Sequence, residues 1–257
     1  MRFILTAATA ATMSTGAMAA AVDLSSWTAE DHGSSSSSSN WQVQGPGNDA
    51  VFQSVNGQPS VFFEAGSNSQ GRQLSGSILS TGSDDDYIGF VLGYDAGDLN
   101  SANGEFLLID WNQGAKSFGV GANSPGLSVS LVSGNIGASA ANFWAHTGPV
   151  QEIERGATLG STGWVRGQSY DFDLVFQSTF LQVFVDGNLE LDINASDAGL
   201  TSFDDGAFGF YNYSQASVLY SGIIEDVAPP DPRAVPAPGA LGLLGLGALL
   251  LGARRRR

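Results

Sequence analysis

The chain has 257 residues, a charged fraction of only 14%, no cysteine and a formal net charge of −15 at pH 7. Five of its ten Lys and Arg lie in the terminal segments, so the body is too acidic for nucleic-acid binding, which depends on clustered cations. Divalent cations are more natural partners, although acidity alone also keeps an exported protein soluble.

Residues 1–21 are predicted to be a secretory signal peptide. They carry one positive charge at Arg2, a short apolar stretch over residues 3–11 and the small-x-small cleavage site Ala17-Met18-Ala19. The mature chain is therefore expected to be exported and to lack the residues up to about Ala19. Without disulfides, a domain of about 200 residues depends on its hydrophobic core or on a metal.

Between residues 22 and 226, short apolar segments alternate with turns, and no amphipathic helix is evident. Apolar and aromatic runs that are bounded by Gly, Asn and Asp predict strands. These runs are 51–55, 60–64, 87–94, 105–111, 127–131, 170–176, 181–185, 189–193, 206–211 and 218–224. The pattern predicts an all-β fold, a two-sheet antiparallel jelly-roll sandwich with at least ten strands over residues 40–226.

Two of these runs alternate apolar and polar residues. Serines alternate with Leu and Val over residues 127–131, and Asp171 and Asp173 alternate with aromatic and aliphatic residues over 170–176. Each of the two strands is therefore expected to have one solvent-exposed face. The clearest hairpin turns at Asp186-Gly187, because this pair supplies the positive φ angles of a type I′ turn.

Three consecutive carboxylates, Asp84, Asp85 and Asp86, precede the strand at 87–94, with no Lys or Arg within ten residues. Like charges so close repel one another unless a cation or water screens them. Calcium binds six to eight oxygens, and a loop adds backbone carbonyls to two or three carboxylates. We expect Asp84 and Asp86 to point the same way and Asp85 to face elsewhere. The alternative is a solvated turn.

Other acidic residues extend the set of candidate calcium ligands. Asp204 and Asp205 precede the strand at 206–211 and form a second candidate site, while Asp110 faces either the solvent or the first site. The candidate metal ligands are Asp84, Asp85, Asp86, Asp110, Asp204 and Asp205.

Catalytic interpretations find less support. A zinc site needs three or four His, Cys or acidic ligands, and the chain has only His32 and His146. His146 is expected to be a structural hydrogen-bonding residue. Asp171 and Asp173 have the separation of glycosidase carboxylates but also the pattern of an ordinary exposed strand face. The five tryptophans are expected in the core of the sandwich.

Residues 227–257 form a proline-rich linker and a tail with three parts. Val235-Pro236-Ala237-Pro238 precedes fifteen uncharged residues, 239–253, and four arginines. Fifteen helical residues span about 22 Å, less than the ~30 Å hydrocarbon core, so the stretch favours a transient membrane contact. The tail resembles PEP-CTERM sorting signals read by exosortases, with Ala237 in place of the usual glutamate. This resemblance implies a Gram-negative bacterium, cleavage near the motif and delivery to the cell surface; a permanent tail anchor is the alternative.

Residues 40–226 resemble the thrombospondin C-terminal domain. The strongest match is DDDYIGFVLGY at 84–94, which is similar to the acidic triplet and Gly-Phe…Gly-Tyr strand of that family. It continues with Asn40 to Val43, Val51, Gln53, Asn56, Phe106 to Trp111, Gln113, Trp144, His146 to Gly148, Gly163-Trp164, Gly206, Gly209-Phe210 and Ser214-Gln215. The resemblance implies a concanavalin- or laminin-G-like jelly roll, calcium binding and a role in adhesion or matrix contact. This sequence does not contain the calcium-rich repeats and epidermal-growth-factor modules of animal thrombospondins, so their receptor sites are not carried over.

Two functions stay open at this point. The first is a calcium-binding adhesion or extracellular-matrix module that contacts an extracellular polysaccharide or a surface protein. The second is a carbohydrate-binding lectin, which a solvent-exposed Trp or Tyr on a concave face would favour. An enzyme is the third and least favoured interpretation.

Overall fold

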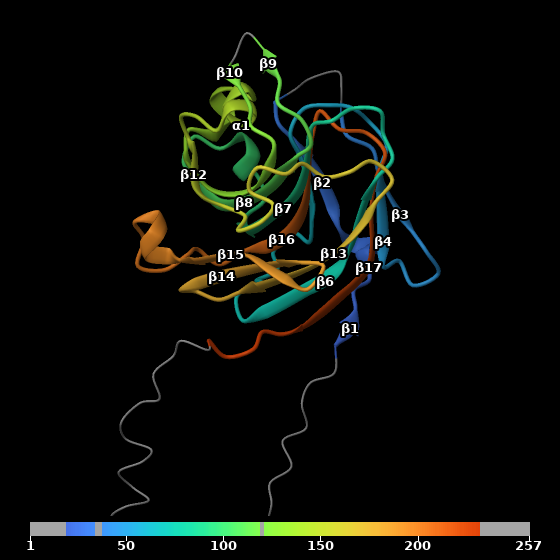
Figure 1. Ribbon diagram of the computed structural model, residues 1–257. Coiled ribbons are helices and arrows are strands. Elements are labelled where there is room, and N and C mark those ends of the chain that lie inside the picture. The colour runs from blue at the N-terminus through green and yellow to red at the C-terminus, as the bar shows by residue number, and fades with distance from the viewer. Residues whose placement is uncertain (1–18, 34–37, 119–120, 232–257) are drawn as a thin grey trace, which may run out of the picture.

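The computed structural model describes residues 19–33, 38–118 and 121–231 (Figure 1). The predicted signal peptide up to residue 18, residues 34–37 of the serine-rich insert and the sorting tail from residue 232 lie outside these ranges. Within them, no helix has the length and apolar character needed to cross a membrane.

Two antiparallel sheets pack face to face and confirm the predicted all-β sandwich (Figure 1). The first sheet contains β1 (Ala20–Ala21), β3 (Trp41–Gln44), β4 (Ala50–Gln53), β6 (Arg72–Ser80), β13 (Ser169–Phe176), β14 (Phe180–Val185), β15 (Asn188–Asn194) and β17 (Val218–Val227). The second contains β2 (Thr28–Asp31), β5 (Ser60–Phe63), β7 (Tyr87–Tyr94), β8 (Gly104–Asn112), β11 (Gly126–Gly134), β12 (Val150–Arg155) and β16 (Ala207–Tyr213).

The strand orders show the crossovers of a jelly roll. The eight-stranded sheet runs β15-β14-β13-β6-β17-β4-β3, with β1 paired to β17, and the seven-stranded sheet runs β12-β11-β8-β7-β16-β5-β2. The remaining elements are β9 (Ser117–Phe118), β10 (Gly121–Ala122), α1 (Ala141–Ala145), η1 (Leu24–Ser26), η2 (Asp98–Asn100), η3 (Ile136–Ala138) and η4 (Ala195–Ala198). Because β1 pairs with Glu225 and Ile224, the fold includes residues 20–21, which were predicted to belong to the signal peptide.

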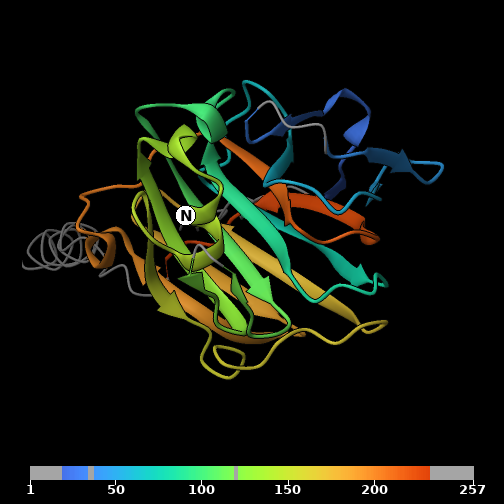
Figure 2. The same ribbon diagram turned by 90° about the horizontal axis from the view of Figure 1, so that it is seen from above.

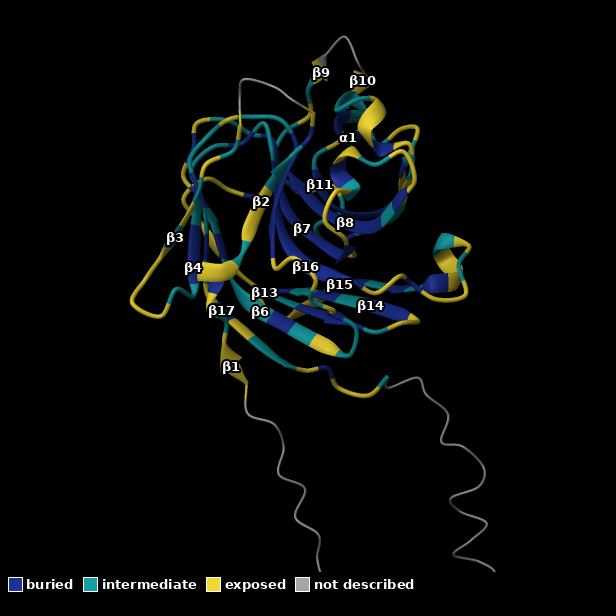
Figure 3. Cartoon of the chain, turned by 180° about the vertical axis from the view of Figure 1, so that it is seen from behind, coloured by how far each residue is buried: buried dark blue, intermediate teal, exposed yellow. Residues whose placement is uncertain are grey.

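The seven-stranded sheet is buried on both faces along its central strands. Its inner face packs against the other sheet, and its outer face is covered by η3, α1 and the neighbouring loops, which contribute Phe143 and Trp144 to a second core. Every residue of β7 is buried, as the dark strands of Figure 3 show. Seen from above in Figure 2, the segment around α1 lies over this sheet.

This second core decides which of the two strands predicted to have a solvent-exposed face actually has one. On β13, Asp171 is exposed and its apolar neighbours are buried, as predicted. On β11 the predicted exposed face is wrong: Ser128 is 1% and Ser130 0% exposed, because the α1 segment covers that side. The turn at Asp186 (φ 49°) and Gly187 (φ 75°) has the two positive angles of the predicted type I′ hairpin.

Tyr220 ties the two sheets together by hydrogen bonds. It belongs to β17 of the eight-stranded sheet, and its buried hydroxyl donates to the Tyr211 carbonyl of β16 at 2.8 Å. The same oxygen accepts from the Gly89 amide of β7 at 3.2 Å. Gly89 also lets β7 lie close to β8, because a Cβ there would lie 2.0 Å from the Ile109 carbonyl oxygen.

We expect Tyr220→Phe to lower the free energy of unfolding by about 1–3 kcal/mol, because buried backbone groups lose their partner. In a domain of this size that is a fall in Tm of roughly 2–12 °C. Tyr213→Phe is the matched control: Tyr213 is partly buried, and its hydroxyl makes no hydrogen bond to a described residue. Calorimetry that gives both variants the same Tm would contradict the bridging role.

Candidate functional site

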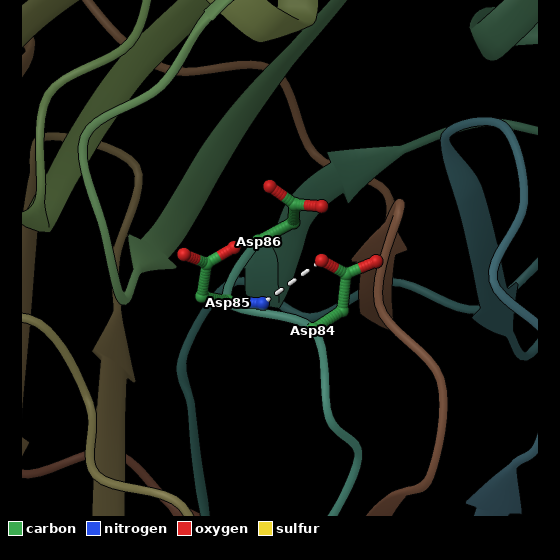
Figure 4. Close-up of side chains that lie close together, drawn as sticks. All are labelled: Asp84, Asp85 and Asp86. Carbon is green, nitrogen blue, oxygen red and sulfur yellow. Dashed lines mark hydrogen bonds between the residues drawn. The ribbon is translucent and has the colours of Figure 1, made fainter.

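The carboxylates of Asp84, Asp85 and Asp86 converge in the loop between β6 and β7 (Figure 4). Each offers one oxygen, and these oxygens all lie within 4.8 Å of one another. Calcium binds oxygens at about 2.3–2.6 Å, so two ligands across an ion are about 5 Å apart. The expectation that Asp85 faces elsewhere is therefore wrong, because the loop is not extended strand and side chains do not alternate along it.

Lys116 supplies the positive charge that this cluster lacks in the sequence. Its Nζ atom lies 3.0 Å from Asp84 Oδ1 and 3.7 Å from Asp86 Oδ1, and it also contacts Asp85 Oδ1. The pairing of β7 with β8, which sets Tyr87 opposite Asn112, brings the segment after β8 beside the triplet. Partial burial alone would lower the pKa of Lys116, but its hydrogen bonds to Asp85 and Asp84 raise it.

Asp86 is the most buried carboxylate of the triplet. It is 2% exposed, and its Oδ1 atom accepts no hydrogen bond from a described residue. Burial raises the pKa of Asp86 to about 6. For Asp84, burial would also raise the pKa, but the hydrogen bond from Lys116 lowers it.

Two further loops complete this end of the sandwich. Asn56, between β4 and β5, donates its side-chain amide to Asp84 Oδ2. Ser214, between β16 and β17, donates to Asn56 Oδ1 at 3.3 Å, and Gln215 Oε1 accepts from the Asp86 amide at 3.1 Å. Carboxylate, amide and hydroxyl oxygens of this kind suit a hard cation.

The other three predicted metal ligands lie elsewhere. Among the described residues, the triplet is the one group with at least three potential ligands close enough to share an ion. The Asp204 carbonyl lies against Gly93, at the opposite end of β7 from the triplet. Asp205 Oδ1 accepts from the amides of Ser69, Gln70 and Gly206 at 3.1, 3.0 and 2.9 Å, so it organises a turn.

Asp110 is wholly buried on the outer face of the seven-stranded sheet. Its carboxylate accepts from Ser128 Oγ at 3.0 Å and lies 2.9 Å from His146 Nε2. His146 Nδ1 lies 3.3 Å from Glu152, which also pairs with Arg155. Burial would lower the pKa of His146, but the charge of Asp110 and the hydrogen bonds to both carboxylates raise it to about 10. His146 is thus the structural hydrogen-bonding residue that the sequence predicts.

The protonated His146 makes stability depend on pH. Its pKa is raised from 6.5 to about 10 by folding, so its contribution is fully present below pH 6.5 and is lost as the pH rises through 10. His146→Gln, which leaves Asp110 buried without a cation, should cost about 3–5 kcal/mol at pH 7. Urea unfolding between pH 6 and 10 should show this cost shrinking with pH; a cost independent of pH would contradict the assignment.

A groove of about 340 Å³ lies at the opposite end of the sandwich from the triplet. Its lining combines two aromatic side chains with amide, hydroxyl and charged groups: Trp27, Glu64, Ser67, Asn68, Arg72, Phe208 and Glu225. Arg72 pairs with Glu225 at 3.3 Å. Sequence reasoning missed the groove, since its residues lie on five separate segments with no common spacing.

The aromatic residues bear directly on the lectin hypothesis. Of the five Trp and six Tyr, all of which the structure describes, none is fully exposed. Trp111, Trp144 and Trp164 are core residues, as predicted, but Trp41 is only partly buried and packs on Phe62 and Tyr220. Trp27 is only partly buried; it stacks on Phe210 at 5.4 Å and lines the groove. A fully exposed aromatic platform is therefore absent among the described residues, and Trp27 and Phe208 are the aromatic side chains that line the groove.

Comparison with known proteins identifies the family. The sequence matches the thrombospondin C-terminal region over residues 36–227. The chain belongs to the thrombospondin C-terminal region family. No curated protein sequence matches it.

Solved structures are similar to this member of the family at low sequence identity. Carbohydrate binding module CBM66 from Bacillus subtilis is 10% identical with a TM-score of 0.52, covering 78% of this chain and 95% of its own. A Bacillus subtilis protein of unknown function with a galectin-like fold is 10% identical (TM-score 0.49, coverage 79% and 90%). The carbohydrate recognition domain of Emp47p is 11% identical (TM-score 0.47, coverage 80% and 90%).

Proposed function

We propose that this chain is a non-catalytic, exported module that binds an extracellular glycan. The observation that carries the proposal is the groove, in which a partly exposed indole adjoins carboxylate, guanidinium and amide groups. The fold shared with a carbohydrate binding module supports it. The predicted signal peptide and sorting tail would place the module at the cell surface, where extracellular polysaccharide is the partner.

The groove suits a sugar by size and by chemistry. Its volume of about 340 Å³ lies in the range of small-molecule sites. A pyranose ring has an apolar face of C–H groups, which packs on an aromatic ring such as Trp27, and an edge of hydroxyls. The Arg72–Glu225 pair offers charged donors and acceptors to those hydroxyls, and such hydrogen bonds are the stronger kind.

The α1 segment covers the outer face of the seven-stranded sheet, so the groove is the better candidate for a glycan-binding site. The outer face of that sheet carries Asp110 and Ser128, but the α1 segment buries both. The outer face of the eight-stranded sheet carries Asp171 and Asp173, whose carboxylates accept from the serines of β6. The carboxylates on these faces are thus already hydrogen-bonded, whereas the groove is lined by the exposed side chains of Glu64, Asn68 and Arg72.

On a glycan array, the full-length protein should bind at least one polysaccharide class, and Arg72→Gln should weaken that binding about 10- to 100-fold, the effect of one charge-assisted hydrogen bond. Arg166→Gln is the matched control, because it removes the same charge from an exposed arginine at the triplet end. An array with no bound glycan would refute the function. Binding that survives Arg72→Gln but not changes in the triplet would move the site to the other end.

The triplet favours calcium-dependent adhesion as a second candidate function. Three converging carboxylates with a buried oxygen on Asp86 suit the hard ligand set of calcium. Asp84, Asp85 and Asp86 would hold the ion, and Asn56 and Ser214 lie beside them. An ion so bound would stiffen three loops at one end of the domain, which would then contact a surface protein or a polymer.

Calcium at a hundredfold excess over its Kd should stabilise the folded protein by about 2.7 kcal/mol and raise the Tm by several degrees. Asp84→Asn combined with Asp86→Asn should abolish this rise and leave a folded protein. If the triplet were only a solvated turn, the double change would relieve repulsion, and the melting curve would respond to calcium no differently from that of the wild type.

A further inference from the structure

We propose that Lys116 is an internal competitor of the divalent cation: its ammonium group occupies the space between the three carboxylates, and calcium binds by displacing it. The inference rests on the calcium function of the triplet proposed above. It adds a residue that sets the affinity of the site and a side chain whose position reports occupancy.

The ammonium group of Lys116 lies among the three carboxylates of the triplet. Lys116 Nζ contacts all three carboxylates, at 3.0 Å from Asp84, 3.7 Å from Asp86 and in close contact with Asp85. Because the three carboxylate oxygens lie within 4.8 Å of one another, the space between them holds one cation. An ammonium and a calcium ion cannot share it, since two cations so close repel strongly.

Lys116 does not provide a hydrogen bond to every carboxylate oxygen of the triplet. An ammonium has three protons to donate and no further bonding capacity. Asp86 Oδ1 is buried and accepts no hydrogen bond among the described residues, and its distance to Nζ is the longest of the three. Lys116 therefore neutralises the triplet only in part. A divalent ion that coordinates several oxygens at once would also coordinate this buried oxygen.

The backbone allows the exchange to occur without unfolding. The amide of Lys116 donates to Asn123 Oδ1 at 2.5 Å, and its carbonyl accepts from the Asn123 amide at 3.0 Å. The main chain is thus fixed across the hairpin of β9 and β10, while the four-carbon side chain, one-third exposed, has a path into solvent. Displacement needs only rotation of the Lys116 side chain.

Two measurements on the full-length protein test the inference. Titration calorimetry with calcium chloride should show that Lys116→Gln binds about tenfold tighter than the wild type, because the competitor is gone. Arg166→Gln, which removes one positive charge from an arginine that donates to the Ser83 carbonyl beside the triplet, should change the Kd less than about threefold. Equal tightening in both variants would mean a general charge effect and would overturn the competition.

The second measurement uses the wild type, so it does not depend on how the variant folds. Lys116 is the only lysine of the chain, and an amine-reactive reagent followed by peptide mass spectrometry reports its accessibility. Calcium should accelerate its labelling about tenfold, whereas labelling of the Asp84→Asn, Asp86→Asn variant should not respond. Calcium binding that leaves both the labelling rate and the Lys116→Gln affinity at wild-type values would overturn the inference and leave the calcium function intact. If neither the wild type nor the Lys116→Gln variant binds calcium, both this inference and the calcium function of the triplet are overturned.

Discussion

The burial of the seven-stranded sheet on both faces is the constraint on which the rest of the structure depends. A sandwich of two sheets has one core, but η3 and α1 add a second core behind β7, β8 and β11. Polar side chains on that face cannot reach water, so a buried charge there needs a partner inside the protein. Asp110 meets this requirement through His146 and Ser128. The same cover removes a broad sheet face as a ligand surface and leaves the two ends of the sandwich for binding.

Much of the fold was predictable because its strands are long apolar runs with sharp turns. The run at 87–94 coincides with β7, and the Asp186-Gly187 turn has the expected geometry. Among the strands of four or more residues, those that escaped prediction are rich in polar residues: β2, β3, β6 and β12. In β6, only Leu74, Ile78 and Ser80 are buried, because side chains alternate between the two faces of the sheet and Arg72 lies at the groove. The local hydrophobic pattern of the sequence identifies buried strands, but it does not identify the polar strands that complete a sheet.

The candidate site was predictable only in its local part. The triplet stands out in the sequence as three adjacent acids. Lys116, its partner, comes 30 residues after Asp86, and only the register of β7 against β8 brings the two together. The groove depends on residues that are still farther apart in the sequence. Besides Trp27, its lining side chains come from β6, β16 and β17 and from the loop that follows β5. Residues with no shared periodicity carry no signal until the sheet order is known.

The scarcity of cations explains why each one lies at a junction between segments. The chain has 25 Asp and Glu, and four Lys and Arg fall within the described residues. Arg72 pairs across strands with Glu225, Lys116 holds the triplet, Arg155 links Glu152 to the carbonyls of Pro125 and Gly160, and Arg166 binds the Ser83 carbonyl. None of these cations is left over to neutralise the remaining acids. The sandwich is therefore held together by its cores, and its charges act locally: each cation fixes a loop, joins two strands or, in the case of Lys116, pairs with the three carboxylates of the triplet.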